Sequence, residues 1–89
     1  MSYKVELEER AIADLQRLPP PVKLFVLKSL DRLRQAEQEG KPTTGLYPKG
    51  FLFELEYALG SLEFYIDVLF RYGPGDDVVT VFQVFFEYV

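Results

Sequence analysis

Hydrophobic and polar residues alternate in several stretches of the chain, and a period of two predicts β-strands with one buried face. Near the N-terminus, Tyr3, Val5 and Leu7 alternate with charged residues. The alternation returns over residues 51–57 and 62–72, with a turn between them, and residues 73–77 (GPGDD) form a second turn. Residues 78–89 are apolar on both faces, which is typical of a central strand or of one that a partner covers. The predicted strands are 3–7, 51–57, 62–72 and 78–89.

Between the first two predicted strands, the apolar residues recur at helical spacing. A short helix is expected over residues 8–17, and the prolines at residues 19–21 end it because proline lacks the N–H that a helix interior needs. Proline is tolerated at the first position of a helix, so a second helix is expected to follow and to end at Gly40. Residues 40–50 combine three glycines and two prolines, which predicts a long loop.

The predicted order is β-α-α-β-β-β, an α+β fold in which a helical hairpin packs on one face of a mainly antiparallel sheet. A length of 89 residues leaves room for one domain, residues 1–89. The other face of the sheet stays open. The residues expected there are mostly polar, aromatic or acidic: Glu54, Glu56, Tyr65, Asp67, Leu69, Arg71, Gln83, Phe85 and Glu87.

Composition and charge narrow the choice of function. The chain has no cysteine and no histidine, so we expect neither a disulfide nor an ordinary zinc site, and no cofactor. No apolar run is long enough for a membrane span and residues 1–4 (MSYK) lack the plan of a signal peptide, so a cytoplasmic protein is expected. Residues 50–89 hold one Lys or Arg against seven Asp or Glu, a poor composition for binding phosphates.

Four runs in the sequence carry a family resemblance: residues 11–19 (AIADLQRLP), 49–55 (KGFLFEL), 68–76 (VLFRYGPGD) and 81–86 (VFQVFF). In order and spacing they resemble the RelE/ParE superfamily, small bacterial toxins of type II toxin–antitoxin systems, and especially its RelE/HigB-like branch. The resemblance spans nearly the whole chain. It implies the same β-α-α-β-β-β fold, a cognate antitoxin partner and, for RelE-like members, metal-independent cleavage of messenger RNA on the ribosome, which inhibits translation. The ParE branch inhibits DNA gyrase instead.

The chain departs from the family where the chemistry would take place. Cleaving RNA without a metal needs a general base, a general acid and cations that stabilise the developing charge. At positions where the resemblance implies Arg, Arg, His and Lys, this chain has Glu56, Asp67, Gln83 and Glu87. At an effective dielectric of about 20, reversing one charge about 5 Å from a phosphate exchanges roughly 3 kcal/mol of attraction for similar repulsion. We therefore expect a weak or inactive nuclease.

The candidate catalytic residues are Lys49, Arg71 and Tyr88, and each has a simpler structural interpretation. Lys49 matches a family position for a catalytic or phosphate-binding lysine, but it also fits a solvated loop. For Arg71 the simpler interpretation is an ion pair with an acidic residue of a neighbouring strand, namely Glu56, Asp67 or Glu87. For Tyr88 the simpler interpretation is an aromatic side chain at the edge of the sheet, without a catalytic role. The candidate RNA-binding or partner-binding residues are Glu56, Tyr65, Asp67, Gln83, Phe85 and Glu87; no ligand spacing predicts a metal site.

Three functional hypotheses remain open. The first, implied by the resemblance, is a RelE-like toxin that cuts messenger RNA on the ribosome and is silenced by an antitoxin. The second is a catalytically inactive member of the fold that only binds a partner, and the third is a ParE-like gyrase inhibitor. A partner is expected in each case, either an antitoxin or a second copy of the chain, because residues 78–89 carry more apolar surface than two small helices can cover.

Overall fold

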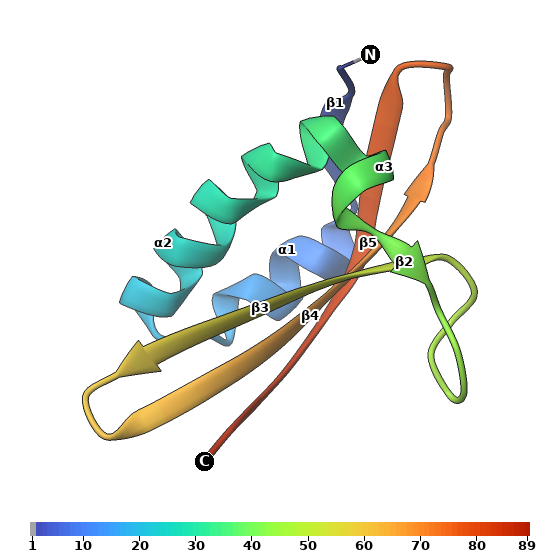
Figure 1. Cartoon of the computed structure of the whole chain (residues 1–89). Coiled ribbons are helices and arrows are strands. Elements are labelled where there is room, and N and C mark those ends of the chain that lie inside the picture. Colours follow the sequence, from blue (N-terminus) through green and yellow to red (C-terminus); the bar gives the residue numbers. More distant parts are fainter. Residues whose placement is uncertain (1) are drawn as a thin grey trace.

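Helices cover one face of a five-stranded sheet in the computed structural model, which describes residues 2–89 (Figure 1). The strands are β1 (Lys4–Leu7), β2 (Lys41–Pro42), β3 (Phe51–Leu59), β4 (Leu62–Tyr72) and β5 (Val78–Tyr88). The helical segments are α1 (Glu9–Gln16), α2 (Pro20–Ser29), the 3-10 helix η1 (Leu30–Gln35) and α3 (Ala36–Glu39). The strand order is β1-β5-β4-β3-β2, parallel between β1 and β5 and antiparallel elsewhere. The predicted α+β fold is confirmed.

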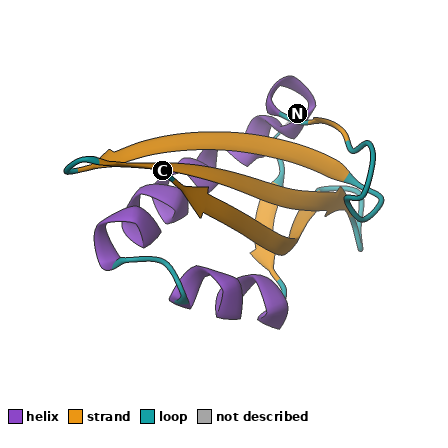
Figure 2. Cartoon of the chain, turned by 90° about the horizontal axis from the view of Figure 1, so that it is seen from below, coloured by secondary structure: helices purple, strands orange, loops and turns teal. Residues whose placement is uncertain are grey.

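The core lies between the helices and the three long strands, which form the extended ribbon at the centre of Figure 2. From β3 and β4 it takes Phe53, Phe64, Ile66 and Phe70, all at most 3% exposed. The helices contribute the apolar residues Leu15, Leu18, Val22, Val26 and Leu33. Burying one such large side chain contributes about 1.5–3 kcal/mol, so the apolar side of each strand determines which face turns inward. The alternation predicted for residues 51–57 and 62–72 therefore leaves the acidic side open.

The second predicted helix is divided into α2, η1 and α3. At the end of α2, the Ser29 hydroxyl donates to the Phe25 carbonyl oxygen at 2.8 Å, a local bond that competes with regular helix geometry. From Leu30 onward the buried apolar residues are Leu30, Leu33 and Ala36, at a spacing of three. A 3-10 helix has three residues per turn, so this spacing keeps all three on the core side.

A bulge in β5 explains why this strand is apolar on both faces. Leu69 lies opposite Gln83 but Phe70 lies opposite Val81, so Phe82 has no direct partner on β4. The extra residue shifts the alternation by one, and Val81 before the bulge and Val84 after it both point into the core. The predicted central position is confirmed, because β5 lies between β1 and β4. The prediction that β5 exposes more apolar surface than the helices cover is wrong for Val79, Val81 and Val84, which are at most 4% exposed.

The predicted loop begins with the short strand β2, which pairs with the start of β3. Residues 43–50 then turn back, and the hairpin is closed by Thr43, whose Oγ1 accepts the Gly50 N–H at 3.0 Å. Gly50 lies so close to its neighbours that a Cβ there would come within 2.8 Å of the Phe70 carbonyl oxygen and 3.1 Å of the Phe82 ring. The missing side chain therefore lets this loop lie close against β4 and β5. Within residues 2–89, no helix is long and apolar enough to cross a membrane.

Candidate functional site

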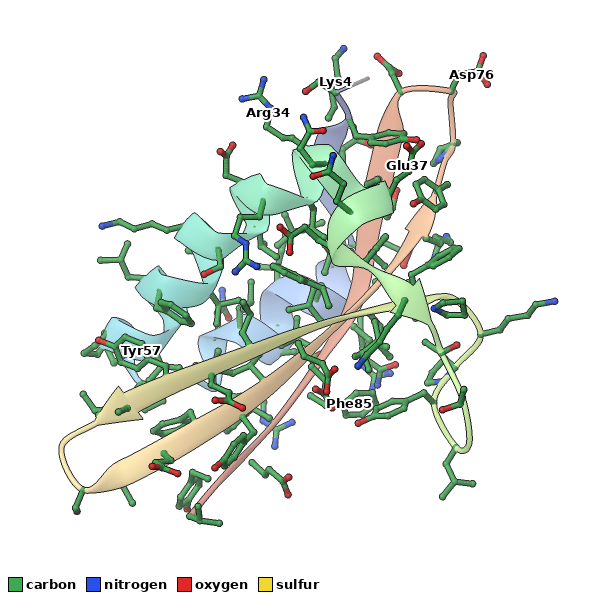
Figure 3. All side chains as sticks on the ribbon, viewed as in Figure 1. Lys4, Arg34, Glu37, Tyr57, Asp76 and Phe85 are labelled. Atoms are coloured by element: carbon green, nitrogen blue, oxygen red, sulfur yellow. The ribbon has the colours of Figure 1, made fainter. Side chains whose placement is uncertain are left out.

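The open face of the sheet carries two adjacent rows of residues across β3, β4 and β5. The first row is Glu54, Asp67 and Phe85, and the second is Glu56, Tyr65 and Glu87. We call these six residues the acidic–aromatic surface. Figure 3 shows Phe85 beside the long strands and near the loop, whereas Tyr57, from the other face of β3, lies beside α2. Each row combines two carboxylates with one aromatic ring, as the sequence predicts for this face.

A hollow of about 390 Å³ lies over this surface, and Tyr47 from the loop closes one side of it. The Tyr47 hydroxyl donates a hydrogen bond to the Asp67 carboxylate, and the Tyr47 ring lies 5.7 Å from that of Phe85. The bond to Asp67, together with burial and the charges of Asp67, Glu54 and Glu87, raises the pKa of Tyr47 to about 12. Tyr47 is therefore a neutral donor at physiological pH.

The carboxylates of the surface are only partly compensated by the chain itself. Glu54 and Asp67 stand directly opposite each other on β3 and β4, an arrangement that destabilises a sheet when both are ionised. Lys41 of β2 forms an ion pair with Glu54, and Tyr47 supplies a neutral donor to Asp67. In the described part of the chain, Glu56 and Glu87 belong to no ion pair. The surface is therefore left with a negative charge.

Arg71 is turned away from these carboxylates. Its Nη2 lies 2.5 Å from Oε2 of Glu8, and its guanidinium lies over the Phe82 ring, 5.2 Å from the centroid. The expected ion pair with Glu56, Asp67 or Glu87 is therefore wrong. The bulge accounts for the difference, because it places Arg71 opposite Thr80, close to the point where the Glu8 N–H donates to the Val81 carbonyl oxygen.

The three candidate catalytic residues do not lie at one site. Lys49 is exposed in the loop and, within residues 2–89, enters no ion pair and no side-chain hydrogen bond. Tyr88 lies opposite Phe64, with the two rings 5.4 Å apart, so it belongs to the helix-covered face, whereas Arg71 is on the open face. Gln83 is half-buried opposite Leu69, which is 0% exposed, so the expectation that Leu69 lies open to solvent on this face is wrong. The catalytic roles of these residues stay predictions.

The acidic–aromatic surface lacks the groups that RNA cleavage needs. A phenol can act as a base only when its pKa is strongly lowered, but the hydrogen bond to Glu63 raises the pKa of Tyr65, and that of Tyr47 is raised as well. The carboxylates could accept a proton, yet within the described residues the hollow over them is lined by no lysine or arginine that could stabilise a phosphorane, and Arg17 lies outside it, over the Phe86 ring. Within the described residues, no group of three acidic side chains is arranged to hold a metal ion.

Sequence reasoning did not identify Tyr47 or Lys41 as part of this surface. Both lie in or beside the segment predicted as a loop, and no periodic pattern relates them to the strands. Their positions depend on the pairing of β2 with β3 and on the closure at Thr43. The glycines and prolines of the segment indicated a turn, but they carried no information on the direction in which it folds.

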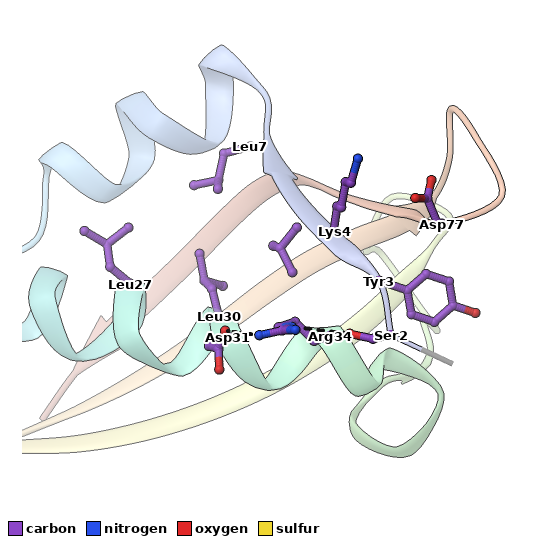
Figure 4. Close-up of a pocket in the computed structure, with 10 residues that line it drawn as sticks. Ser2, Tyr3, Lys4, Leu7, Leu27, Leu30, Asp31, Arg34 and Asp77 are labelled. Carbon is purple, nitrogen blue, oxygen red and sulfur yellow. Dashed lines mark hydrogen bonds and ion pairs between the residues drawn. The ribbon is translucent and has the colours of Figure 1, made fainter.

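A second and larger hollow, of about 650 Å³, lies between β1 and the helical segments α2 and η1 (Figure 4). Val5, Leu7, Leu27 and Leu30 give it an apolar floor. Charged residues stand at its rim, where Arg34 lies 3.7 Å from Asp31. The basic residues of the predicted second helix are likewise partly paired, since Arg32 contacts Glu39 at 2.7 Å. Among the described residues, neither of the two hollows is lined by Lys49 or Arg71.

Comparisons with known proteins identify the fold. A scan against protein-family models and a search of curated proteins each found no match. Among solved structures, the chain is similar to the RelBE2 toxin–antitoxin complex of Mycobacterium tuberculosis, with a TM-score of 0.69, 21% identity, and coverage of 98% of this chain and 93% of that chain. It is also similar to a double arginine-to-alanine mutant of the E. coli toxin RelE in the free state, with a TM-score of 0.59, 19% identity, and coverage of 94% and 82%.

A third similar structure is the archaeal RelE–RelB complex from Pyrococcus horikoshii OT3, with a TM-score of 0.56, 21% identity, and coverage of 94% of this chain and 93% of that chain. The likeness extends over nearly the whole length in each case. The chain therefore has the fold of the RelE toxins, and the resemblance seen in the sequence is confirmed at the level of the fold.

Proposed function

We propose that this protein is a RelE-like component of a type II toxin–antitoxin system, that it is held by a cognate antitoxin, and that its ability to cut messenger RNA is weak or absent. The fold supports the first part, together with the fact that several of the similar structures are complexes of RelE with RelB. A cytoplasmic location and a single domain over residues 1–89 belong to the same proposal.

The acidic–aromatic surface carries the second part of the proposal. A phosphate backbone brought to this face would meet Glu56, Asp67 and Glu87, while Arg71 is already paired with Glu8. Binding of nucleic acid gains most of its free energy when Lys and Arg displace counterions from phosphates. Carboxylates at these positions reverse that contribution. This favours the partner-binding interpretation over an active endonuclease, and no described feature specifically favours gyrase as a target.

The test is cleavage of messenger RNA in a purified translation reaction. The wild-type protein is expected to leave the messenger intact, and its expression is expected to leave bacterial growth unchanged. A Glu56→Arg, Asp67→Arg, Glu87→Lys variant, which restores the charges that the resemblance implies, is expected to bind RNA more tightly than the wild type. Codon-associated cuts made by the wild-type protein would refute the proposed loss of activity.

The partner is tested separately. A short reading frame beside the gene is expected to encode a small DNA-binding protein, and co-expression of the two chains is expected to give a stable complex. If the adjacent products do not bind this chain, the toxin–antitoxin assignment fails, whatever the result with RNA.

A further inference from the structure

We propose that the acidic–aromatic surface binds an extended, cationic segment of a partner protein, with Lys or Arg at alternate positions. This inference deepens the proposed function, on which it rests for the existence of a partner. It assigns the open face of the sheet a ligand of the opposite charge to RNA.

The spacing of the two rows fits an extended segment. Residues that share one face of a strand lie about 6.6 Å apart, two residues at about 3.3 Å each. The side chains on one side of an extended peptide have the same repeat. A segment that lies along the strands therefore presents successive alternate side chains to the row of Glu54, Asp67 and Phe85 and then to the row of Glu56, Tyr65 and Glu87.

The chemistry of each row suits a guanidinium or an ammonium group. Carboxylates attract the charge, and the faces of Phe85 and Tyr65, which are 38% and 37% exposed, are open to cation–π contact. The chain makes the same combination elsewhere, since Arg71 has a carboxylate oxygen of Glu8 at 2.5 Å and lies 5.2 Å above the Phe82 ring. This internal example shows that an arginine can be held between a carboxylate and a ring on this sheet.

The position of Lys41 shows that this surface already holds one cation of the chain itself. The Lys41 ammonium group reaches from β2 onto Glu54, at the edge of the hollow, and so occupies one end of the surface with a cation. Glu56 and Glu87, in the next row, have no such partner within residues 2–89. Cations from a partner would form with Glu56 and Glu87 the kind of ion pair that Lys41 forms with Glu54.

The negative charge of the acidic–aromatic surface also favours a cationic segment over a neutral or anionic ligand. Glu54 and Asp67 stand opposite each other, and a cationic ligand would reduce the repulsion between them that Lys41 and Tyr47 leave uncompensated. A neutral apolar segment would bury the carboxylates without compensation, which is unfavourable. A polyanion would add to the repulsion.

The experiment measures binding of a short fluorescent peptide in which arginine alternates with threonine, by anisotropy. A peptide with glutamine in place of arginine is the uncharged control, and a single-stranded RNA is the third ligand. The site variant is Glu56→Gln, Asp67→Asn, Glu87→Gln. The matched control is Glu9→Gln, Asp31→Asn, Asp76→Asn, which removes the same charge from exposed positions away from the open face.

The wild-type protein is expected to bind the arginine peptide and not the glutamine peptide. The site variant should bind at least about tenfold more weakly, and the control variant within about twofold of the wild type. Phe85→Ala should also weaken binding, since it removes the exposed ring but no charge. Thermal melts check that each variant is folded. Glu87→Lys, a single change at an exposed position, replaces the triple variant if the latter unfolds.

Three results would overturn this inference or the function beneath it. Equal weakening in the site and control variants would mean that only the net charge attracts the peptide, and would overturn the inference. Absence of binding by the wild type to the arginine peptide would do the same, and the proposed function would stand as long as RNA is not bound either. Binding of RNA by the wild type would instead contradict the proposed loss of RNA recognition.

Discussion

Two like-charged side chains face each other across the sheet on its open face. Glu54 and Asp67 are directly paired in the register of β3 and β4, and Lys41 and Tyr47 each reach over to one of them. A position selected only for stability would have an opposite charge or a neutral residue here. This pairing is one of the observations that support a cationic ligand for the open face.

Asp67→Asn is expected to stabilise the protein. The change removes the repulsion from Glu54 and keeps an oxygen that accepts the Tyr47 hydroxyl, so the free energy of unfolding should rise by about 0.2–1 kcal/mol. Urea unfolding at low and high salt measures it, and the gain should shrink as salt screens the repulsion. Asp31→Asn is the control, because Asp31 has an arginine as its neighbour and should gain nothing. A loss of stability in Asp67→Asn would show that the repulsion is negligible.

The Tyr47–Asp67 contact predicts a loss of stability in alkali. The pKa of Tyr47 is raised to about 12 in the folded chain, against an ordinary value of about 10. A group whose pKa is raised by folding stabilises the fold below its unfolded pKa, so this contribution is present at neutral pH and is lost as the pH rises from about 10 through about 12.

A spectroscopic titration of the phenolate checks this. Tyr47→Phe should remove one late-titrating component, and Asp67→Ala should move the Tyr47 component toward lower pH, because it removes the acceptor. If the component lost in Tyr47→Phe titrates near the ordinary value of about 10, and Asp67→Ala leaves the wild-type curve unchanged, Tyr47 does not hold the bond to Asp67 in solution.

At the scale of the element, β5 is held by different partners along its length. Its first residues pair with β1, and beyond Val81 the outer edge is next to α1. There the Val84 N–H donates to a carboxylate oxygen of Asp14 at 2.9 Å, and Asp14 is only 8% exposed. A helix side chain thus replaces the strand that is missing at this edge.

Asp14→Ala is expected to cost about 1–3 kcal/mol in the free energy of unfolding, because it leaves a buried N–H without an acceptor. Asp14→Asn retains an acceptor and should cost less. Arg10→Ala should have little effect, since Arg10 is exposed and lies 3.8 Å from Asp14. The measurement is urea unfolding of all three variants. An Asp14→Ala protein as stable as the wild type would contradict the role given to this bond.

The elements also show what the sequence could and could not predict. Alternation in β3 and β4 is uninterrupted, so the placement of Glu54, Glu56, Tyr65 and Asp67 on the open face followed from a period of two. In β5 the bulge at Phe82 changes the phase, and its trace in the sequence is the odd spacing of the polar residues Thr80 and Gln83 on either side of it. The strand therefore looked two-sided, and both the partner of Arg71 and the face on which Tyr88 lies escaped prediction.

The division of the second helix and the path of the loop have a similar explanation. The spacing of three among Leu30, Leu33 and Ala36 was present in the sequence but is compatible with either kind of helix over so short a stretch. The loop is positioned by its contact with β3 and by the lack of a side chain at Gly50, which are tertiary facts. Local patterns thus identified the elements, and long-range packing determined their ends.

For the molecule as a whole, the fold resembles that of toxins that act on RNA, whereas the negative charge of residues 50–89 favours a cationic ligand. The fold is that of the RelE toxins, but the half of the sequence that builds the three long strands has a net charge of −6. The larger hollow of Figure 4 lies on the helix side, and its lining, which includes Asp77 from that half, carries both signs. A fold shared with the RelE toxins thus carries, on its open face, a charge of the same sign as RNA.

The most direct test of this account is the binding of a fluorescent single-stranded RNA to the purified wild-type chain, followed by anisotropy as the salt concentration is raised. No saturable binding is expected at any salt concentration, because the open face offers carboxylates and paired cations to the phosphates. Saturable binding that weakens steeply with salt, and is abolished by changes at Lys49 and Arg71 but not at the basic residues of α2, would contradict it.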